Sequence, residues 1–438
     1  MQAIKTKPEL ILPAGDPEKA RFAFEYGADA VYLGMAKYSM RKTEVRFTIS
    51  EIGKTIDYAH KLGKRVYITF NIFAHDKHLK TLASDIKKIA ALNPDAFVIA
   101  DMGVLNIIRK NAPKIPIHIS TQQNTVNAEA VKLWKDFGIK RVILARELSL
   151  KEIKKIHDEV PDIELEMFVH GAMCISYSGR CLLSAYMTGR EANLGDCAQP
   201  CRWQYKVHSG ERGATHAIGR TSKCEKSEYF LEEKLRPGEL FPVEENADGT
   251  YLMNSKDLAL IEHLNEIQKA GVTGLKIEGR NKSIYYLGVV TRAYRTALDS
   301  LASSRHSGLL GILPELKKEL ETLNYRGYTT GFAFGNAKSG ETYPSRQPVR
   351  NYNFIAVVRP KGKYKDLSYI EVRNQIKVGD KIDVITPEGV TKEKILGITN
   401  ESGNELDVIN PGHTNQMAYL KLSKTYPEMS LMRKKIKK

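Results

Sequence analysis

Residues 9–34 read ELILPAGDPEKARFAFEYGADAVYLG, and this stretch contains one complete unit of strand, helix and strand. Its two apolar runs, residues 10–12 and 30–33, are short and suited to buried strands. Residues 18–26 between them show the apolar spacing of a helix, and Gly27 follows where a C-cap glycine would lie. This pattern is typical of the βα units that build a parallel sheet.

The same alternation continues along the chain. Eight short runs are expected to be strands: residues 10–12, 30–33, 66–70, 96–100, 117–119, 142–145, 165–169 and 275–278. Helical spacing separates several of them, at residues 18–26, 52–62, 79–92, 128–137 and 150–160. Eight strands with intervening helices predict a TIM-like (β/α)8 barrel of the α/β class, although an open doubly wound sheet would show the same alternation.

The barrel is expected to occupy residues 1–325, with a cysteine-bearing insertion at residues 171–255 between the seventh and eighth strands. A loop of that length in a compact domain is usually functional, and this one leaves the strand end at which barrel enzymes place their chemistry. Helices are expected at residues 257–270 and 283–301, with a further helical stretch at 316–323.

The last part of the chain changes character. Residues 326–350, rich in Gly, Tyr, Thr and Ser, are expected to form a linker, and residues 351–425 a small antiparallel β-barrel domain. Six short strands are expected there: residues 354–359, 369–373, 381–385, 391–396, 406–409 and 418–422. Residues 426–438 are expected to form a basic tail outside that domain.

The charge balance makes nucleic acid a candidate partner. Lys and Arg number 67 against 51 Asp and Glu, which gives a formal net charge of +16. Such a field attracts polyanions, although a generally Lys-rich composition would give the same total. No apolar run approaches the length of a membrane span, and the first apolar stretch is too short for a signal-peptide core. We therefore expect a cytoplasmic protein without a membrane partner.

All five cysteines lie between residues 174 and 224. Cys174, Cys181, Cys197 and Cys201 fall within twenty-eight residues, in a Gly-, Ser- and Arg-rich setting that disfavours buried apolar cysteines. Four thiolates are enough to hold a 4Fe-4S cluster or one zinc ion. The wide spacing of the first two disfavours a zinc ribbon or finger, so zinc is the alternative. Cys224 lacks such a setting and is expected to be a bystander.

Polar residues follow the ends of the expected strands and should converge on the rim of the barrel. They are Asn71, Asp101, Gln122, Arg146, His170, Glu278 and Arg280, together with Lys276 inside the eighth strand. His170, Glu278 and Arg146 are the candidate catalytic residues. Arg280, Lys276, Asn71 and Gln122 are the candidate substrate-binding residues. The cationic members suit a carboxylated small molecule, because a guanidinium binds a carboxylate through two hydrogen bonds.

Five blocks of this sequence resemble the family of collagenase-like peptidases of unknown catalytic type. They are residues 9–34, then FVHGAMCISYSGRCLLS, GDCAQPCRWQY, YLMNSKDL and GLKIEGRNKSIYY, in the order found in that family. Chain length and the CRW block are most similar to the members that hydroxylate the wobble uridine of tRNA. The resemblance implies 5-hydroxyuridine as product, tRNA as partner, prephenate as co-substrate and a 4Fe-4S cluster on Cys174, Cys181, Cys197 and Cys201.

Two other functions remain open at this stage. The family name implies a peptidase, for which Cys174 and His170 could form a catalytic pair, but the sequence offers no HExxH or Gly-x-Ser-x-Gly motif, and that pair leaves three clustered cysteines unexplained. The third hypothesis is a non-catalytic RNA-binding protein with a structural zinc. The colour of the purified protein separates it from a cluster enzyme, because zinc thiolate sites do not absorb visible light.

Overall fold

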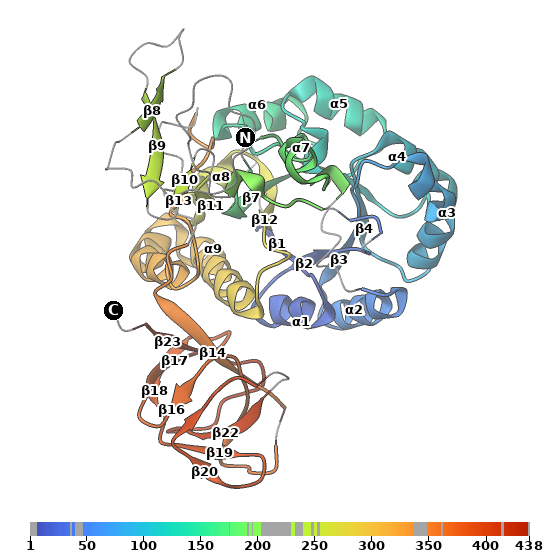
Figure 1. Cartoon of the computed structure of the whole chain (residues 1–438). Coiled ribbons are helices and arrows are strands. Elements are labelled where there is room, and N and C mark those ends of the chain that lie inside the picture. Colours follow the sequence, from blue (N-terminus) through green and yellow to red (C-terminus); the bar gives the residue numbers. More distant parts are fainter. Residues whose placement is uncertain are drawn as a thin grey trace, which may run out of the picture.

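The computed structural model describes residues 7–35, 37–39, 47–174, 176–190, 192–194, 196–202, 229–232, 240–246, 249–251, 255–335, 348–360, 362–412 and 416–436. Eight parallel strands close into a barrel (Figure 1). They are β1 (Glu9–Pro13), β2 (Ala30–Leu33), β3 (Arg65–Phe70), β4 (Ala96–Ile99), β5 (Ile117–Ile119), β6 (Arg141–Ile143), β7 (Glu164–Ala172) and β12 (Val272–Ile277). Pairing of β12 with both β1 and β7 closes the ring, which confirms the TIM-like prediction and excludes the open sheet.

Helices surround the barrel on the outside (Figure 1). They are α1 (Pro17–Glu25), α2 (Ile49–Lys61), α3 (Asp76–Ala90), α4 (Met102–Asn111), α5 (Ala128–Asp136), α6 (Leu150–Glu159), α8 (Leu264–Lys269) and α9 (Ile284–Leu320). Their starts follow local chemistry: the Asp16 side chain caps α1, and capping boxes at Thr48 and Ser149 begin α2 and α6. Short 3-10 turns occur at Thr121–Gln123, Ala192–Leu194, Pro200–Arg202 and Ile261–His263.

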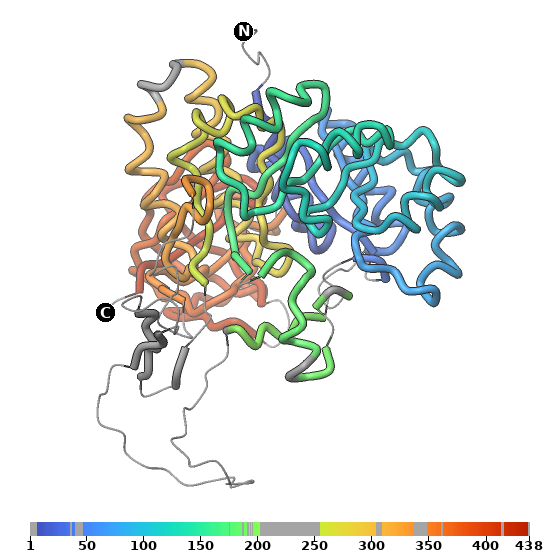
Figure 2. The backbone as a smooth tube through the Cα atoms, turned by 90° about the horizontal axis from the view of Figure 1, so that it is seen from above, coloured from blue at the N-terminus to red at the C-terminus, as the bar shows by residue number. Residues whose placement is uncertain are grey.

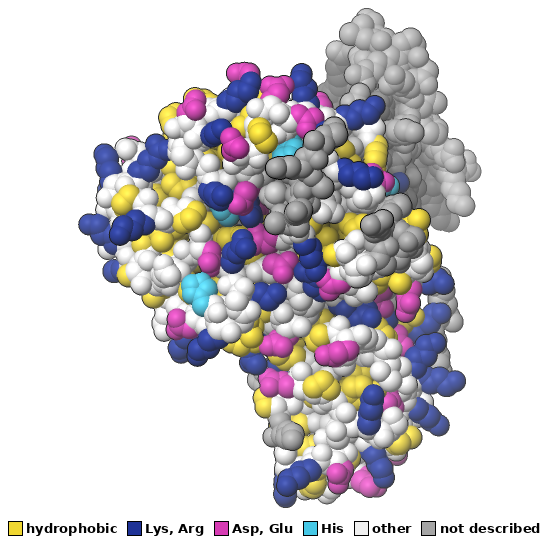
Figure 3. Space-filling model, turned by 180° about the vertical axis from the view of Figure 1, so that it is seen from behind, with side chains coloured by type: hydrophobic (Ala, Val, Ile, Leu, Met, Phe, Trp, Pro, Cys, Tyr) yellow, Lys and Arg dark blue, Asp and Glu magenta, His cyan; other side chains and the backbone are white. Residues whose placement is uncertain are grey.

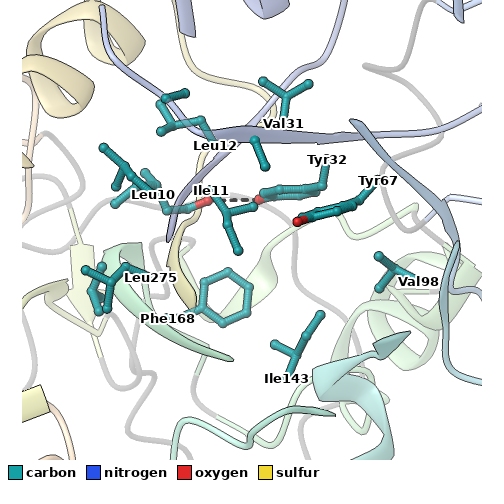
Figure 4. Packing of buried hydrophobic residues seen from close by; sticks show 14 of the residues in the cluster. Leu10, Ile11, Leu12, Val31, Tyr32, Tyr67, Val98, Ile143, Phe168 and Leu275 are labelled. Atoms are coloured by element: carbon teal, nitrogen blue, oxygen red, sulfur yellow. Dashed lines mark hydrogen bonds between the residues drawn. The ribbon is translucent and has the colours of Figure 1, made fainter. Parts of the chain in front are cut away.

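Alternation along the strands divides the apolar side chains into two sets. Figure 4 shows Tyr32, Tyr67 and Phe168 facing the centre of the barrel, whereas Leu10 and Leu275 lie on the outer side, toward the helices. All five are at least nine-tenths buried. The centre of the barrel is therefore filled with side chains.

The insertion after β7 contains α7 (Leu183–Thr188) and the strands β8 (Tyr229–Glu232), β9 (Leu240–Asn246) and β10 (Gly249–Tyr251). It ends in β11 (Asp257–Ala259), which pairs antiparallel with β7 and parallel with β13 (Tyr328–Thr329). The helix expected over residues 257–270 is therefore wrong in its first half. Residues 257–259 extend the sheet at the end of β7, and the α-helix begins only at Leu264.

The two helical stretches expected at residues 283–301 and 316–323 belong to one helix, α9, which contains Pro314. In the described part of the chain, no helix has the length and apolarity needed to cross a membrane. The expected linker at 326–350 contains β13 and a bridge between Tyr325 and Val349, and its residues 336–347 lie outside the described residues.

The C-terminal domain is a curved antiparallel sheet with the order β18-β17-β23-β14-β15-β22-β19-β20. Its strands are β14 (Tyr352–Val358), β15 (Ser368–Val372), β17 (Lys381–Ile385), β18 (Val390–Lys394), β19 (Gly397–Asn400), β20 (Glu405–Leu406), β22 (Met417–Lys421) and β23 (Leu431–Lys435); β16 (Ile376–Lys377) pairs with β21 (Val408–Ile409). The prediction of a basic tail at residues 426–438 is wrong, because Leu431–Lys435 form β23 in the middle of the sheet.

Buried polar contacts join this domain to the barrel. The hydroxyl of Tyr26, the residue that follows α1, lies 2.9 Å from the Ile385 carbonyl and 3.0 Å from the Met429 carbonyl. Arg433 on β23 donates to Glu319 at the end of α9 at 2.9 and 3.0 Å. Figure 1 shows β14 emerging beside α9, with the C-terminal sheet below the barrel.

Candidate active site

A pocket lies at the carboxyl-terminal ends of the barrel strands, where enzymes of this fold place their chemistry. It is lined by Tyr32, Thr69, Asn71, Val98, Ser120, Thr121, Gln122, Ile143, Arg146, Phe168, Cys174, Ser178, Gly179, Lys276, Glu278 and Arg280. The structure thus brings together all the candidate catalytic and substrate-binding residues except His170. It adds Cys174, the first of the candidate metal ligands.

Three cationic side chains share this lining. Arg280 is buried, donates to Thr69 Oγ1 at 2.9 Å and also to Ser39, and its guanidinium carbon lies 4.9 Å from the centre of the Tyr32 ring. Lys276 Nζ lies 4.1 Å from the centre of the same ring. Tyr32 thus brings the two cations close to one another beneath the pocket mouth. This concentration of positive charge favours an anionic ligand.

Arg146 supplies the third cation from the loop after β6. It donates to the Ala172 carbonyl at 2.9 Å, and its guanidinium carbon lies 4.0 Å from the centre of the Phe168 ring. Its Nε is buried without a hydrogen-bond partner among the described residues. A buried donor of that kind is unfavourable until an acceptor arrives, and a ligand carboxylate is such an acceptor.

A network of charges lies below the pocket and holds Lys276 in place. Glu166, fully buried, accepts from Lys276 Nζ at 2.6 Å and from Arg141 at 3.2 Å, and Arg141 also bonds Glu9 at 2.6 Å. Burial lowers the pKa of Lys276, and the neighbouring Arg280 acts in the same direction, whereas Glu166 opposes them. An anion bound above Lys276 would stabilise its ammonium form.

Neutral and acidic groups complete the wall. Gln122 Nε2 donates to the Asn71 carbonyl at 3.2 Å, and its amide oxygen accepts from Ser120. The Tyr32 hydroxyl lies 3.4 Å from Glu278 Oε2 and 3.0 Å from the Ile277 carbonyl. Glu278 is the one carboxylate among the described residues that line the pocket.

The prediction that His170 lies at the rim of the barrel pocket is wrong. Its ring is buried among Tyr286, Tyr294 and Tyr328, with centroid separations of 6.0, 5.5 and 5.5 Å, and it does not line the pocket. The reason is a bulge in β7: Phe168 pairs with Lys276, but His170 pairs with Ile277, so one extra residue reverses the alternation. His170 therefore faces away from the barrel interior.

Asp101 also has a structural task. Its side chain accepts from the Val104 amide at 2.9 Å and caps α4, and it is not part of the pocket lining. Conversely, sequence reasoning missed Tyr32, Thr69, Ser120 and Phe168. Alternation along β2, β3 and β7 could have pointed to three of them, because each lies on the inward face of its strand.

The cysteine segment covers the mouth of the barrel (Figure 2). Cys174, Ser178 and Gly179 line the pocket, and Gly179 has a φ of 75° with its α-carbon close against Gln122. A Cβ at that position would come within 3.1 Å of the Gln122 side chain, so glycine permits both the left-handed backbone and the close approach.

Cys174 is exposed, whereas Cys181, Cys197 and Cys201 are partly buried. The Gln199 amide donates to Cys197 Sγ at 3.3 Å, a contact that also stabilises a thiolate. Among the described residues, no three Cys, His, Asp or Glu side chains lie close enough to hold a metal ion. The four thiols fit a 4Fe-4S cluster in kind and number. Cys224 lies outside the described residues.

Comparison with known proteins identifies relatives over most of the chain. The model of peptidase family U32 matches residues 15–342, and that of the peptidase family U32 C-terminal domain matches residues 350–433. The chain is 39% identical over 425 residues to tRNA hydroxylation protein P of Escherichia coli, covering 92% of this chain and 91% of that protein.

Two further relatives carry different names. A 23S rRNA 5-hydroxycytidine synthase of Escherichia coli is 33% identical over 424 residues, covering 92% of this chain and 58% of that protein. A collagenase of Porphyromonas gingivalis is 28% identical over 338 residues, covering 75% of this chain and 73% of that protein.

Proposed function

The chain belongs to peptidase family U32, and from this membership and the contents of its pocket we propose that it is an RNA hydroxylase acting on tRNA. The Escherichia coli relatives, named for tRNA hydroxylation and for 5-hydroxycytidine in 23S rRNA, support the reaction class. The proposed product is 5-hydroxyuridine at the wobble position of the anticodon. The tRNA relative is 39% identical and this chain covers 91% of it, against 33% identity and 58% coverage for the ribosomal RNA relative, which favours tRNA over ribosomal RNA.

The observation that carries the proposal is the group of three cations in the barrel pocket. Prephenate, the proposed co-substrate, has two carboxylates, and Arg146, Lys276 and Arg280 supply positive charge to one small site. Arg146 also has a buried N–H without a partner in the described structure. Two carboxylates would balance this charge, and a bidentate Arg contact would fix the orientation of the ligand.

Glu278 is the proposed proton acceptor. Placing a hydroxyl on C5 of a uracil ring is a two-electron oxidation, for which the proposed co-substrate and cluster would supply the oxidant; the hydrogen of the broken C5–H bond leaves as a proton. Glu278 is the carboxylate in the described pocket lining, and the Tyr32 hydroxyl, 3.4 Å away, can hold it in position. Asn71 and Gln122 supply amide groups on the opposite wall for the polar edge of a base.

We propose that Cys174, Cys181, Cys197 and Cys201 hold a 4Fe-4S cluster, which would supply redox or Lewis-acid chemistry at the pocket mouth. Cys174 lines the pocket and links this segment to the cationic wall. Peptide-bond cleavage, the alternative that the collagenase relative raises, lacks the expected catalytic pair. Cys174 lies in the pocket, while His170 is buried on the other side of β7.

Mass spectrometry of tRNA from a strain deleted for this gene tests the activity. We expect 5-hydroxyuridine to disappear and to return with the wild-type chain, but not with Glu278→Gln, whose amide cannot accept the proton. Return of the modified nucleoside with Glu278→Gln would remove Glu278 from the mechanism. Unchanged tRNA in the deletion strain, together with cleavage of gelatin by the purified chain, would establish the peptidase instead.

Metal analysis of anaerobically purified protein tests the cluster. We expect a brown protein with about four irons and four sulfides per chain, whose colour is lost in Cys174→Ala and in Cys201→Ala but kept in Cys224→Ala. Loss of colour in Cys224→Ala and not in Cys201→Ala would reassign the fourth ligand. A colourless protein with one bound zinc would contradict the cluster and favour the structural-zinc alternative.

A further inference from the structure

A second cavity, of about 610 Å3, lies where the barrel meets the C-terminal domain. The barrel contributes Asp16, Glu18, Lys19, Asn281, Lys282, Ser283, Ile284, Tyr285, Tyr286, Leu323 and Asn324; the C-terminal side contributes Arg350, Tyr352, Phe354, Arg373 and Asn374. We call it the interdomain groove. Its walls come from segments far apart in the sequence, so it exists only because the two domains dock.

Positive charge predominates in the interdomain groove. Four cationic side chains line it against two carboxylates, and both carboxylates are already engaged. Glu18 pairs with Arg359 at 2.5 Å, and Asp16 caps α1 and pairs with Lys19 at 3.3 Å. Arg373 pairs with Glu371 at 2.8 Å, whereas Arg350 donates at 2.7 Å to the neutral amide oxygen of Asn353. Positive charge in the groove therefore remains available to bind an external anion.

The amino-terminal end of α9 adds to this field. Ser283, its N-cap, and the first three helical residues line the groove, and the first turn contains no acidic residue. The partial positive charge at the start of a helix favours phosphate there. The amides of Asn281, Asn324 and Asn374 provide further hydrogen-bonding groups around the same space.

The groove is adjacent to the barrel pocket. Arg280 lines the pocket, and the next residues, Asn281 and Lys282, line the groove. Lys19 in the groove donates to the Arg280 carbonyl at 3.4 Å. The loops that follow β1 and β12 thus form a shared wall, so both cavities lie at the same end of the barrel.

On the face seen from behind, positive charge is spread over both domains. Figure 3 shows Lys and Arg side chains interspersed with Asp and Glu over that face, in both domains. Net charge alone therefore does not locate an RNA site, whereas a cation-lined groove beside the reaction pocket does.

We propose that the interdomain groove binds phosphates of the RNA backbone next to the nucleotide held in the barrel pocket. The inference rests on the proposed function and adds to it the surface that positions the substrate. Arg350 and Arg373 come from the C-terminal side, so that domain takes a direct part in substrate binding. Phosphate contacts of this kind fix the register of an RNA without reading its sequence.

The test measures binding of unmodified tRNA, purified from the deletion strain, to the full chain over a range of salt concentrations. The variant is Arg350→Ala/Arg373→Ala, in which both replaced side chains are exposed. We expect at least a tenfold loss of affinity. The slope of log K against log salt should fall by about 1 to 2, because each lost phosphate contact removes about 0.7 to 0.9.

Lys392→Ala/Lys394→Ala is the charge-matched control, since both lysines are exposed on β18, which does not line the groove. Its slope should stay that of the wild type, and Arg350→Lys/Arg373→Lys should restore most of the slope. If the wild type binds and hydroxylates tRNA but the groove variant behaves like the control, the groove does not bind the RNA backbone, and the proposed function still stands. If the wild type does not bind tRNA, the proposed substrate and the groove fail together.

Discussion

Arg146 has a buried Nε–H without a hydrogen-bond partner in the described structure. A lysine at this position would keep the charge but not the planar pair of donors that matches a carboxylate. We expect Arg146→Lys to weaken prephenate binding about tenfold or more, equivalent to about 1.4 kcal/mol. Isothermal titration of the purified chain with prephenate measures this. An unchanged dissociation constant would place the carboxylate elsewhere.

Arg109→Lys is a suitable control for that titration, because Arg109 is an exposed residue of α4 outside the pocket lining. It should bind prephenate as the wild type does. The comparison separates a specific contact in the pocket from a general effect of replacing arginine by lysine.

His170 should make the folded protein sensitive to acid. Burial, with a smaller effect from Lys282, lowers its pKa to about 3. The unfolded chain binds this proton near pH 6.5, so the contribution to stability is complete above that pH and declines as the pH falls toward 3. The loss amounts to about 2 kcal/mol at pH 5. When the pH is lowered from 7 to 5, the free energy of unfolding should therefore fall about 2 kcal/mol less in His170→Phe than in the wild type.

Urea titrations of both proteins at the two pH values measure the difference, and between pH 7 and pH 8 the two proteins should change in parallel. Equal acid sensitivity would show that His170 is protonated in the folded state. His170→Phe should also keep its hydroxylation activity, because the ring lies outside the pocket. Loss of activity in the folded variant would return His170 to the list of catalytic residues.

The residues of the pocket show what sequence can and cannot predict. Asn71, Gln122 and Arg146 were predictable, because a polar residue directly after a buried strand lies at the barrel mouth by geometry. His170 was not, because the bulge at Phe168–His170 leaves no mark in the pattern of side chains, and strict alternation would turn His170 inward. The cysteine contacts with the barrel likewise depend on tertiary packing of a long segment.

At the scale of elements, the eight barrel strands were predicted because each is a buried apolar run, whereas short or basic elements were not. Helix α4 has apolar side chains at Val104, Leu105 and Ile108, and such a short run is also compatible with a strand. Strand β11 owes its form to pairing with β7 and β13, which are distant in sequence. Strand β23 ends in charged residues and resembles a solvated tail.

Strand β23 should be essential for the C-terminal sheet. It lies between β17 and β14, and Leu431 and Met432 are fully buried. A chain ending at Glu428 would leave both neighbours with unpaired edges and an open core, so we expect that domain to unfold. Limited trypsin digestion with mass spectrometry should show rapid cleavage after residue 350. A chain ending at Ile436 retains the strand and should resist cleavage, and equal resistance of both chains would show that β23 is dispensable.

At the scale of the whole molecule, Arg433 connects the two domains through one buried guanidinium. It bonds Glu319 at the end of α9, Thr322 at 2.7 Å and Asp383 at 2.9 Å. Arg433→Met would leave the Glu319 and Asp383 carboxylates in place without their cation. Breaking a buried pair in this way costs about 3 to 5 kcal/mol, so the thermal unfolding midpoint should fall by several degrees.

The same variant should lose affinity for tRNA below its unfolding temperature, because the interdomain groove requires both domains to stay docked. Adding Glu319→Gln to Arg433→Met should recover part of both losses, since it removes one of the unpaired carboxylates. Lys435→Met, an exposed position on the same strand, should change neither property. If Arg433→Met lowers the unfolding midpoint while tRNA binding and its salt dependence stay those of the wild type, the groove does not depend on docking through Arg433. Substrate binding would then belong to the barrel alone.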